Sequence, residues 1–328
     1  MGPSISRRTM LKAAGVLGAA GALGLAGPAS IAAQATPAQP RRRRVLRLAH
    51  LTDLHIQAER QAYEGVVSCL HHVQSQEDKP DLILTGGDLI MDALATGRNR
   101  VKAQWDLLTK ALKSECSIPI EHCLGNHDIW GWHKGKSGTT GNEEQWGKRW
   151  ALDLLGLPGP YRSFDRAGWH FVVLDSVHPD GDDATGKYIG KLDEAQHEWL
   201  AADLAAVPAT TPVLILSHIP ILTVTPLVGG QDKDRRDWRV PAALMLTDWR
   251  RLHKLFQKHP NVKLALSGHM HLHDRVEYGG VTYICDGAVC GNWWKGRHID
   301  CDEGYGLVDL YDDGTFEHRY VTYGWKAR

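Results

Sequence analysis

The chain has 328 residues, of which 43% are hydrophobic and 23% are charged, so it is long and apolar enough to bury a sizeable core. Its formal net charge of +0 at pH 7 gives it no general attraction to nucleic acids or anionic membranes. We therefore predict no stable nucleic-acid or membrane partner. The 18 His and 12 Trp residues are unusual counts, but counts alone do not define a site.

The N-terminal residues have the pattern of an export signal. Arg7 and Arg8 precede an apolar stretch rich in Gly and Ala, residues 13–32, and Ala-Gln-Ala at residues 33–35 is typical of a cleavage site. We predict a twin-arginine signal peptide at residues 1–35. A membrane anchor is the alternative, but the stretch lacks the bulky apolar side chains of a stable span.

This signal predicts an exported protein, periplasmic or extracellular, with the twin-arginine translocase as its partner during export. That route carries proteins already folded, which suits a protein that takes up a cofactor in the cytoplasm. Residues 36–44, with arginines at 41–44, are expected to form a basic, solvated linker, the alternative being a contact with a polyanion. The folded domain is expected at residues 45–328.

Short apolar runs alternate with amphipathic stretches from residue 45 onward. In chain order they predict a strand at 45–51, a helix at 58–76, a strand at 81–85, a helix at 101–113, a strand at 118–124, a helix at 143–155, strands at 161–165 and 169–174, a helix at 193–207, a strand at 212–216, a helix at 247–258 and a strand at 262–266. Asp193 is the expected N-cap of its helix.

Two β-hairpins are predicted near the C-terminus, at residues 275–285 and 306–323, within an extension covering about residues 275–328. Strands that alternate with helices and then close with hairpins predict an α/β sandwich in a single domain.

Five segments each place a metal-binding type of residue directly after a predicted strand. They are Asp53-Leu54-His55, Gly86-Gly87-Asp88, Gly125-Asn126-His127-Asp128, Ser217-His218-Ile219-Pro220 and Gly268-His269-Met270-His271. Loops at the carboxyl ends of strands converge on one crevice in α/β sheets, so these side chains can surround a single point. Each segment alone is a weak signal, but all five in this order predict a metal site.

This set of motifs resembles the calcineurin-like metallophosphoesterase superfamily, over about residues 45–274. The resemblance implies a four-layer α/β/β/α sandwich, with a dinuclear metal centre between the sheets of a catalytic domain. It implies that Asp53, His55 and His271 bind one metal ion and that Asn126, His218 and His269 bind the other. The carboxylate of Asp88 would bridge the two ions.

The chemistry of phosphoric-ester hydrolysis requires such ligands. Two cations about 3.5–4 Å apart bind the phosphoryl oxygens and the attacking hydroxide. Carboxylate oxygen and neutral imidazole suit Mn, Fe or Zn, and the lack of Cys in the motifs argues against a thiolate site. A water between the ions would have a lowered pKa, so a metal-bridging hydroxide would be the nucleophile without a separate base.

His127 is the expected general acid, which would protonate the leaving alkoxide. Asp128 would orient the His127 ring and raise its pKa. The alternative for His127 is a supporting structural role. His50 and His273 also lie near the motifs, and we expect them to support ligands or to lie at the surface.

The motifs also separate the branches of the superfamily. In purple acid phosphatases the first motif resembles Asp-x-Gly and a Tyr ligand follows Gly-Asp, whereas this chain has His55 and Leu89. The combination found here resembles cyclic-nucleotide and other phosphodiesterases. We therefore predict a phosphodiesterase that acts on a small-molecule phosphoester, with nucleotide-like substrates as candidates. The alternatives are a phosphomonoesterase and a non-catalytic metal-binding or scaffold protein.

Three regions are candidates for substrate recognition. Trp130 and Trp132 are expected either to stack on a substrate or to pack their loop, and Trp293-Trp294-Lys295 could reach the crevice. Residues 221–246 carry Lys233, Arg235 and Arg236, which suit an anionic group or a solvated lid.

The six cysteines show no Cys-x-x-Cys spacing, which excludes a zinc ribbon. Export permits disulfides, so Cys285, Cys290 and Cys301 could contain one pair, or they could be buried free thiols.

Overall fold

The computed structural model describes residues 42–181, 185–229, 234 and 236–327. The expected signal peptide, residues 1–35, lies outside the described residues, as do residues 36–41 of the expected linker. Residues 42–328 form one compact unit. No helix in the described part of this unit is long and apolar enough to cross a membrane.

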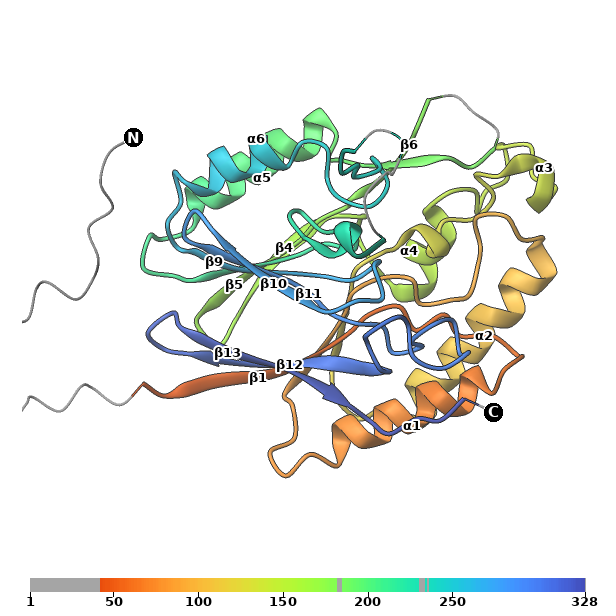
Figure 1. Ribbon diagram of the computed structural model, residues 1–328, viewed down its shortest axis with the longest axis horizontal. Coiled ribbons are helices and arrows are strands. Elements are labelled where there is room, and N and C mark those ends of the chain that lie inside the picture. The colour runs from red at the N-terminus through yellow and green to blue at the C-terminus, as the bar shows by residue number, and fades with distance from the viewer. Residues whose placement is uncertain (1–41, 182–184, 230–233, 235, 328) are drawn as a thin grey trace, which may run out of the picture. The chain divides into compact units, whose positions relative to one another are not determined.

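Two β-sheets lie face to face at the centre of this unit (Figure 1). The first sheet has the order β13-β12-β1-β2-β3, with β1 at Arg44–Leu51, β2 at Leu82–Thr85, β3 at Ile120–His122, β12 at Gly304–Tyr311 and β13 at Phe316–Thr322. The second has the order β10-β11-β9-β8-β5-β4, with β4 at Arg162–Arg166, β5 at Trp169–Val173, β8 at Val213–Leu216, β9 at Val262–Ser267, β10 at Asp274–Tyr278 and β11 at Val281–Cys285. A separate two-stranded sheet pairs β6, Val177–Pro179, with β7, Tyr188–Gly190.

Parallel pairing dominates the parts of both sheets that carry the motifs. In the first sheet β1, β2 and β3 are parallel neighbours, and in the second sheet β5, β8, β9 and β11 are parallel neighbours. The alternation of side chains along each strand sends one set of residues between the sheets and the other set outward. On β1, for example, Leu46 and Leu48 pack between the sheets, whereas Ala49 and Leu51 pack against the outer helices.

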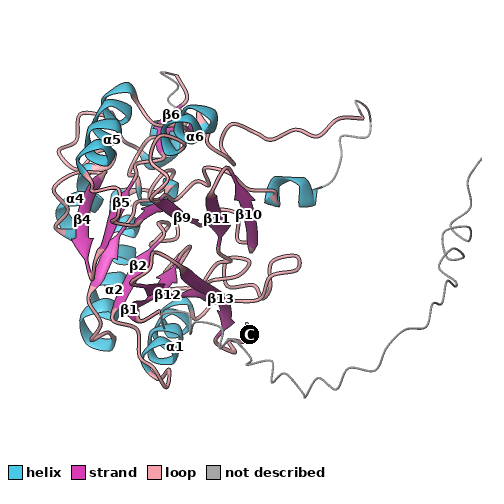
Figure 2. Cartoon of the chain, turned by 90° about the vertical axis from the view of Figure 1, so that its left-hand side faces the viewer, coloured by secondary structure: helices cyan, strands magenta, loops and turns pink. Residues whose placement is uncertain are grey.

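Helices cover the outer face of each sheet, so the strands stand between two helical layers (Figure 2). The first sheet is covered by α1, Ala62–Gln74, α2, Arg98–Glu115, and α4, Arg149–Leu155. The second sheet is covered by α5, Glu194–Ala206, and α6, Trp249–Phe256. Shorter helices are α3, Lys134–Ser137, and the 3-10 turns η1, Asn126–Asp128, and η2, Thr225–Gly229. The four-layer α/β/β/α arrangement expected from the sequence is confirmed.

Some element boundaries differ from the sequence-based prediction. The helix expected at residues 143–155 begins only at Arg149, because Gly147 adopts a left-handed φ of 71° and its N–H donates to Trp130 O at 2.8 Å. The helix expected from residue 58 begins at Ala62, after two left-handed residues. Asp193 is the N-cap of α5 as predicted, since its side chain accepts a hydrogen bond from Gln196 N at 2.8 Å.

Both C-terminal hairpins form as predicted, but each joins a different sheet. The hairpin of β10 and β11 extends the second sheet, while β12 pairs with β1 in the first sheet. The basic segment before β1 contacts this second hairpin: Arg42 pairs with Glu317, and Arg43 N donates to Asp312 Oδ1 at 2.9 Å. The last residue of the expected linker, Arg44, is the first residue of β1.

Candidate active site

Seven side chains predicted as metal ligands come together at the carboxyl ends of five strands. The first sheet supplies Asp53 and His55 after β1, Asp88 after β2 and Asn126 after β3. The second sheet supplies His218 after β8 and His269 and His271 after β9. The site therefore lies where the ends of the two sheets meet.

The first group of candidate ligand atoms comes from Asp53, His55 and His271. Nε2 of His271 lies 3.3 Å from Oδ1 of Asp53 and 3.2 Å from Nε2 of His55. The other Asp53 oxygen, Oδ2, accepts hydrogen bonds from Thr52 Oγ1 at 2.6 Å and His269 N at 2.9 Å. Oδ1 is buried and has no hydrogen-bond partner among the described residues. A bound cation would satisfy this oxygen and the two imidazole nitrogens that face it.

The second group comes from Asn126, His218 and His269. Nε2 of His218 lies 3.0 Å from Oδ1 of Asn126 and 3.1 Å from Nδ1 of His269. His218 Nδ1 donates to the Gly86 carbonyl oxygen at 2.8 Å, which turns Nε2 toward the centre of the group. The arrangement again offers one oxygen and two nitrogens to a cation.

Asp88 stands between the two groups. Its Oδ2 lies 3.6 Å from Nε2 of His55 and 3.3 Å from Nε2 of His218. Its Oδ1 accepts a hydrogen bond from the backbone N–H of His127 at 2.8 Å. One carboxylate oxygen therefore faces both groups, while the other fixes the segment that carries His127.

Burial controls the charges of the site. Burial lowers the pKa of His55 to about 3 and the pKa of His269 to about 3, which keeps both rings in the neutral form that binds metals. For His218, the Asp88 carboxylate outweighs burial and raises the pKa to about 9. The Asp88 carboxyl keeps a pKa well below its ordinary value, because His218 and His127 outweigh the effect of burial. The buried Asp88 carboxylate is thus ionised and paired with a protonated His218, and a cation bound there would take the place of that proton.

Five of the seven residues have left-handed backbone conformations, which are uncommon for residues with a side chain. Their φ angles are 56° for Asp53, 42° for His55, 52° for Asp88, 70° for His269 and 53° for His271. Asp and His tolerate this region better than most residues. The reversed backbone bends each loop sharply after its strand, so the ligands stay close to the strand ends.

Two glycines allow these loops to approach each other closely. A Cβ at Gly125 would lie 2.1 Å from Asp88 Oδ1 and 2.3 Å from Asp88 N. A Cβ at Gly268 would lie 1.8 Å from Thr52 Oγ1. Glycine is therefore required at both positions by the space available beside the ligands.

His127 lies beside the first group but outside it. Its side chain is 27% exposed, whereas His55 is fully buried, and the two rings meet edge to face with centroids 4.7 Å apart. Its Nδ1 lies 3.8 Å from Oδ1 of Asp92.

Asp128 does not orient the His127 ring, which corrects the sequence-based expectation for its role. Its carboxylate accepts hydrogen bonds from Leu89 N and Gly125 N, both at 2.8 Å. Burial, followed by the charge of Asp88, raises the pKa of Asp128 to about 7. Asp128 therefore ties together the loops after β2 and β3, and Asp92 is the carboxylate nearest to the His127 ring nitrogen.

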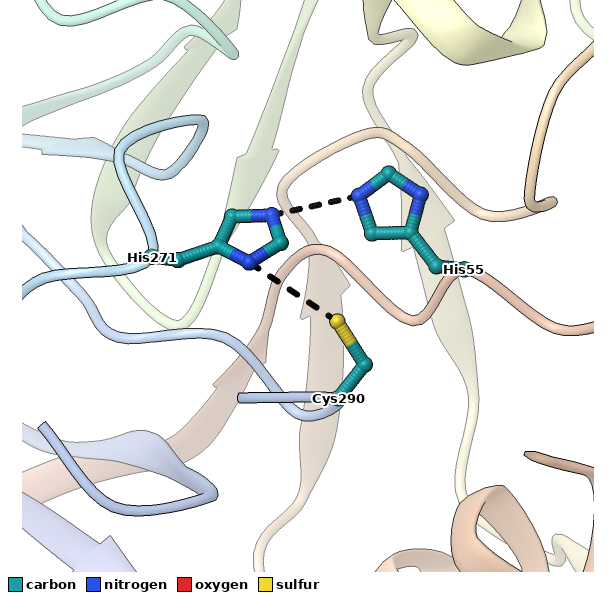
Figure 3. A group of neighbouring side chains, drawn as sticks. All are labelled: His55, His271 and Cys290. Carbon is teal, nitrogen blue, oxygen red and sulfur yellow. Dashed lines mark hydrogen bonds between the residues drawn. The ribbon is translucent and has the colours of Figure 1, made fainter. Parts of the chain in front are cut away.

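Cys290 is a neighbour of the ligands that the motifs did not reveal. Figure 3 shows the His271 ring with one nitrogen directed at His55 and the other at Cys290. The Cys290 sulfur lies 3.9 Å from Nδ1 of His271, which also contacts the Gly291 carbonyl oxygen at 2.5 Å. Cys290 thus supports the side of His271 that faces away from Asp53. Within the described chain all the cysteines are free, including Cys285 and Cys301, so the buried-thiol alternative holds.

The remaining candidates have supporting positions. His50 Nδ1 and His273 Nδ1 lie 2.8 and 3.4 Å from the buried carboxylate of Asp286. Trp130 and Trp132 are buried, and Trp130 Nε1 donates to the Thr96 carbonyl oxygen at 3.2 Å, so they pack their loop. In the segment at residues 221–246, Lys233 and Arg235 lie outside the described residues, and Arg236 is exposed.

The Trp293 ring does reach the site. Its centroid lies 4.5 Å from that of His271 and 6.0 Å from that of His55. Trp294 is buried, and its Nε1 donates to the His55 carbonyl oxygen at 3.0 Å. The aromatic pair that follows β11 therefore contacts both the ligand side chains and their backbone.

Comparisons with known proteins agree with this geometry. Residues 46–273 match the family described as calcineurin-like phosphoesterase. Residues 4–24 match the twin-arginine translocation signal sequence, so the protein is exported across a membrane.

Two relatives are named as phosphodiesterases. A 3′,5′-cyclic-nucleotide phosphodiesterase from Nostoc sp. is 24% identical over 82% of this chain and 89% of its own length. A cAMP/cGMP dual specificity phosphodiesterase from Mycobacterium tuberculosis is 23% identical over 84% of this chain and 79% of its own length.

Among solved structures, a dimetal phosphatase from Danio rerio has a similar fold, with a TM-score of 0.54 and 16% identity over 86% of this chain and 100% of the other. The match over residues 46–273, which contain all the predicted ligands, places this chain in the calcineurin-like phosphoesterase family, as a metal-dependent phosphoesterase.

Proposed function

We propose that this protein is a phosphodiesterase that works with two metal ions. The observation that carries this proposal is the position of Asp88 Oδ2, which lies 3.6 Å from His55 Nε2 and 3.3 Å from His218 Nε2. A single carboxylate oxygen shared by two groups of ligands is the arrangement that a pair of neighbouring ions requires. In this proposal Asp53, His55 and His271 hold one ion, and Asn126, His218 and His269 hold the other, with Asp88 as the bridge.

The bound pair supplies a hydroxide nucleophile near neutral pH and neutralises charge on the phosphoryl oxygens. The ligands are oxygen and imidazole nitrogen, which suit Mn, Fe or Zn. Cys290 approaches His271 on the nitrogen that faces away from Asp53, so we assign it a supporting contact and not a ligand bond.

In this mechanism His127 donates a proton to the oxygen of the departing alcohol. Its ring is partly exposed and lies against His55, and its backbone N–H is held by Asp88 Oδ1 at 2.8 Å. Asp92, 3.8 Å from His127 Nδ1, acts as a positioning residue for the His127 ring. The proton is thus delivered from a residue that is fixed relative to the bridging carboxylate.

A diester is favoured over a monoester by the relatives from Nostoc and Mycobacterium, which are both named as cyclic-nucleotide phosphodiesterases. We further propose that the mature enzyme begins after residue 35, that residues 45–328 are its catalytic domain, and that it acts in the periplasm or outside the cell. Its substrate is then a small phosphoester that is present beyond the inner membrane.

The test compares bis-p-nitrophenyl phosphate with p-nitrophenyl phosphate on protein reconstituted with Mn, Fe or Zn, together with metal analysis of each sample. The expected result is about two ions per chain at full activity and a higher kcat/KM for the diester. A higher kcat/KM for the monoester would indicate a phosphatase. One ion per chain at full activity would contradict the two-metal mechanism, and a metal-loaded protein that hydrolyses neither ester would be a scaffold protein.

A further inference from the structure

We infer that Trp293 is a stacking platform for a flat aromatic group of the substrate, such as a nucleobase, held beside the metal ligands. This inference rests on the proposed function and adds a specificity-determining residue to it. Three observations carry it: the place of the Trp293 ring, the rigidity of its loop and the burial of the other tryptophans near the motifs.

The Trp293 ring lies at the edge of the first ligand group. Its centroid is 4.5 Å from that of His271, with an angle of 35° between the ring planes, and 5.9 Å from that of His298. The residue is only partly buried, unlike the neighbouring Trp294. The centroids of His127 and Trp293 lie 4.7 and 6.0 Å from that of His55. A substrate that receives a proton from His127 therefore lies within reach of the Trp293 ring.

The loop that carries Trp293 is tied to the first motif. Val289 N donates to the Thr52 carbonyl oxygen at 2.9 Å, and Cys290 N donates to the Asp53 carbonyl oxygen at 3.2 Å. The loop is closed on itself by a hydrogen bond from Asn292 N to the Gly296 carbonyl oxygen at 2.8 Å. These contacts fix the loop relative to the ligands in advance of substrate binding, which lowers the entropy cost of that binding.

Trp294 anchors the pair from the opposite side. It is buried and packs against Gly65 of α1, which has no side chain: a Cβ on Gly65 would lie 2.1 Å from the Trp294 ring. The Trp294 ring also meets that of Trp325 edge to face. Both Trp293 and Trp294 have left-handed φ angles, 48° and 66°. Such a conformation is costly for a bulky residue, by about 1–3 kcal/mol, and it persists only where the surroundings hold it. Here it places one ring in the core and the other on the ligands.

Trp130 and Trp132 do not offer an equivalent surface. Trp130 is 3% exposed and Trp132 is 9% exposed, and both pack within the loop after β3. Of these three tryptophans, Trp293 is the one that is partly exposed and whose ring contacts candidate ligand side chains. Stacking on such a ring tolerates any base, because every base has a flat face, so the inference specifies an aromatic group and not one particular base.

The test measures kcat/KM for cyclic AMP and for the same cyclic ribose phosphate with a methoxy group in place of the base. In the parent protein we expect a preference for cyclic AMP. In Trp293→Leu the ratio of the two constants should fall about tenfold, which is within the range measured for base–aromatic stacking. Trp293→Phe should keep the ratio within about twofold of the parent, since a ring remains.

The matched control is Trp249→Leu, a half-buried tryptophan of α6 that packs against His253 and Tyr278, and it should leave the ratio unchanged. Metal content is measured for each variant, because Trp293 also touches His271. A fall in both constants by the same factor would show that Trp293 only supports His271, and no preference for cyclic AMP in the parent would contradict stacking. A parent that hydrolyses bis-p-nitrophenyl phosphate but neither cyclic ester overturns this inference alone, whereas a parent that hydrolyses none of the three overturns the proposed function as well.

Discussion

The left-handed backbone at the candidate ligands shows how much of the site depends on single residues. Asp53, His55, Asp88, His269 and His271 each have a φ between 42° and 70°. A residue in this region costs about 1–3 kcal/mol, and such residues cluster where function requires an unusual geometry. The neighbouring glycines let the strained loops meet without steric overlap, so a small change beside a ligand should have a large effect.

Gly125→Ala tests that expectation. The added methyl group would overlap Asp88 Oδ1 and Asp88 N, so the bridging carboxylate must move or the loop must shift. We expect the free energy of unfolding to fall by about 1–3 kcal/mol, as in other overpacked cores, and the metal content to fall with it. Denaturant titration and metal analysis measure the two effects. The control is Gly135→Ala, where the nearest atom to a Cβ is His133 Cε1 at 3.9 Å. Parental metal content in Gly125→Ala would contradict the tight approach.

His127→Ala tests the general acid. We expect kcat for cyclic AMP, whose alkoxide needs a proton to leave, to fall by about 10²–10⁴-fold. The loss for bis-p-nitrophenyl phosphate should be much smaller, because nitrophenolate leaves without a proton. The metal content should equal that of the parent, and His259→Ala, a half-exposed residue after α6, should leave both rates unchanged. Equal losses with the two substrates would show that His127 has only a structural role.

At the scale of elements, the strand ends were predictable and the loops were not. Each motif follows an apolar run, and such runs give strong strand signals, so the order of residues predicted that the five motifs meet at one place. The assignment of seven candidate ligands within them came from the family resemblance. Asp92, Cys290 and Trp293 reach the site through the paths of irregular loops, which no periodicity describes. The assignment of Asp128 failed for the same reason: adjacency in sequence to His127 did not predict that its carboxylate would turn toward Leu89 N and Gly125 N. The predicted start of a helix was wrong near Gly147, because this residue has a left-handed backbone that the apolar pattern of the helix does not reveal.

The hairpin of β4 and β5 is joined to α5 by a histidine whose charge depends on pH. His170 on β5 lies 3.0 Å from Oδ2 of Asp203 and 2.7 Å from Oδ1 of Asp165. The Asp203 hydrogen bond outweighs burial and raises the pKa of His170 above its ordinary value. Because the folded-state pKa is the higher one, this contact stabilises the fold fully below the unfolded pKa of about 6.5 and is lost as the pH rises through the folded pKa.

His170→Gln should therefore cost stability at low pH and cost less at high pH. We expect the difference in unfolding free energy between parent and variant to shrink by about 1–2 kcal/mol from about pH 6 to about pH 9, the size of a charged hydrogen bond. Urea titrations of both proteins at the two pH values measure it. A constant difference would mean that the ring contributes by packing alone.

At the scale of the whole molecule, the candidate site joins the two halves of the sandwich. Asp53, Asp88 and Asn126 belong to the first sheet, and His218 and His271 belong to the second. Ions bound there would hold the ends of the sheets together, in addition to the apolar core between them.

Removal of metal should therefore lower the stability of the whole fold. We expect protein treated with a chelator to unfold at a lower temperature than the loaded protein, with a loss of about 4 kcal/mol per site when free metal is about 1,000 times its Kd. Thermal unfolding followed by circular dichroism, before and after metal is returned, measures the effect. Asp53→Asn, which weakens one group, should show a smaller difference than the parent. Equal unfolding temperatures with and without metal would contradict a stabilising link between the sheets.

Because the candidate ligands are divided between two sheets, they are synthesised in two separate stages. During synthesis Asp53, Asp88 and Asn126 leave the ribosome long before His269 and His271. The second group is therefore complete only when the chain has passed His269, and the first only when it has passed His271. β12, which pairs with β1 and closes the first sheet, is made later still. The twin-arginine signal at residues 4–24 is made before all of these residues. Metal uptake before export would then have to follow completion of the chain, which makes it a late step in maturation.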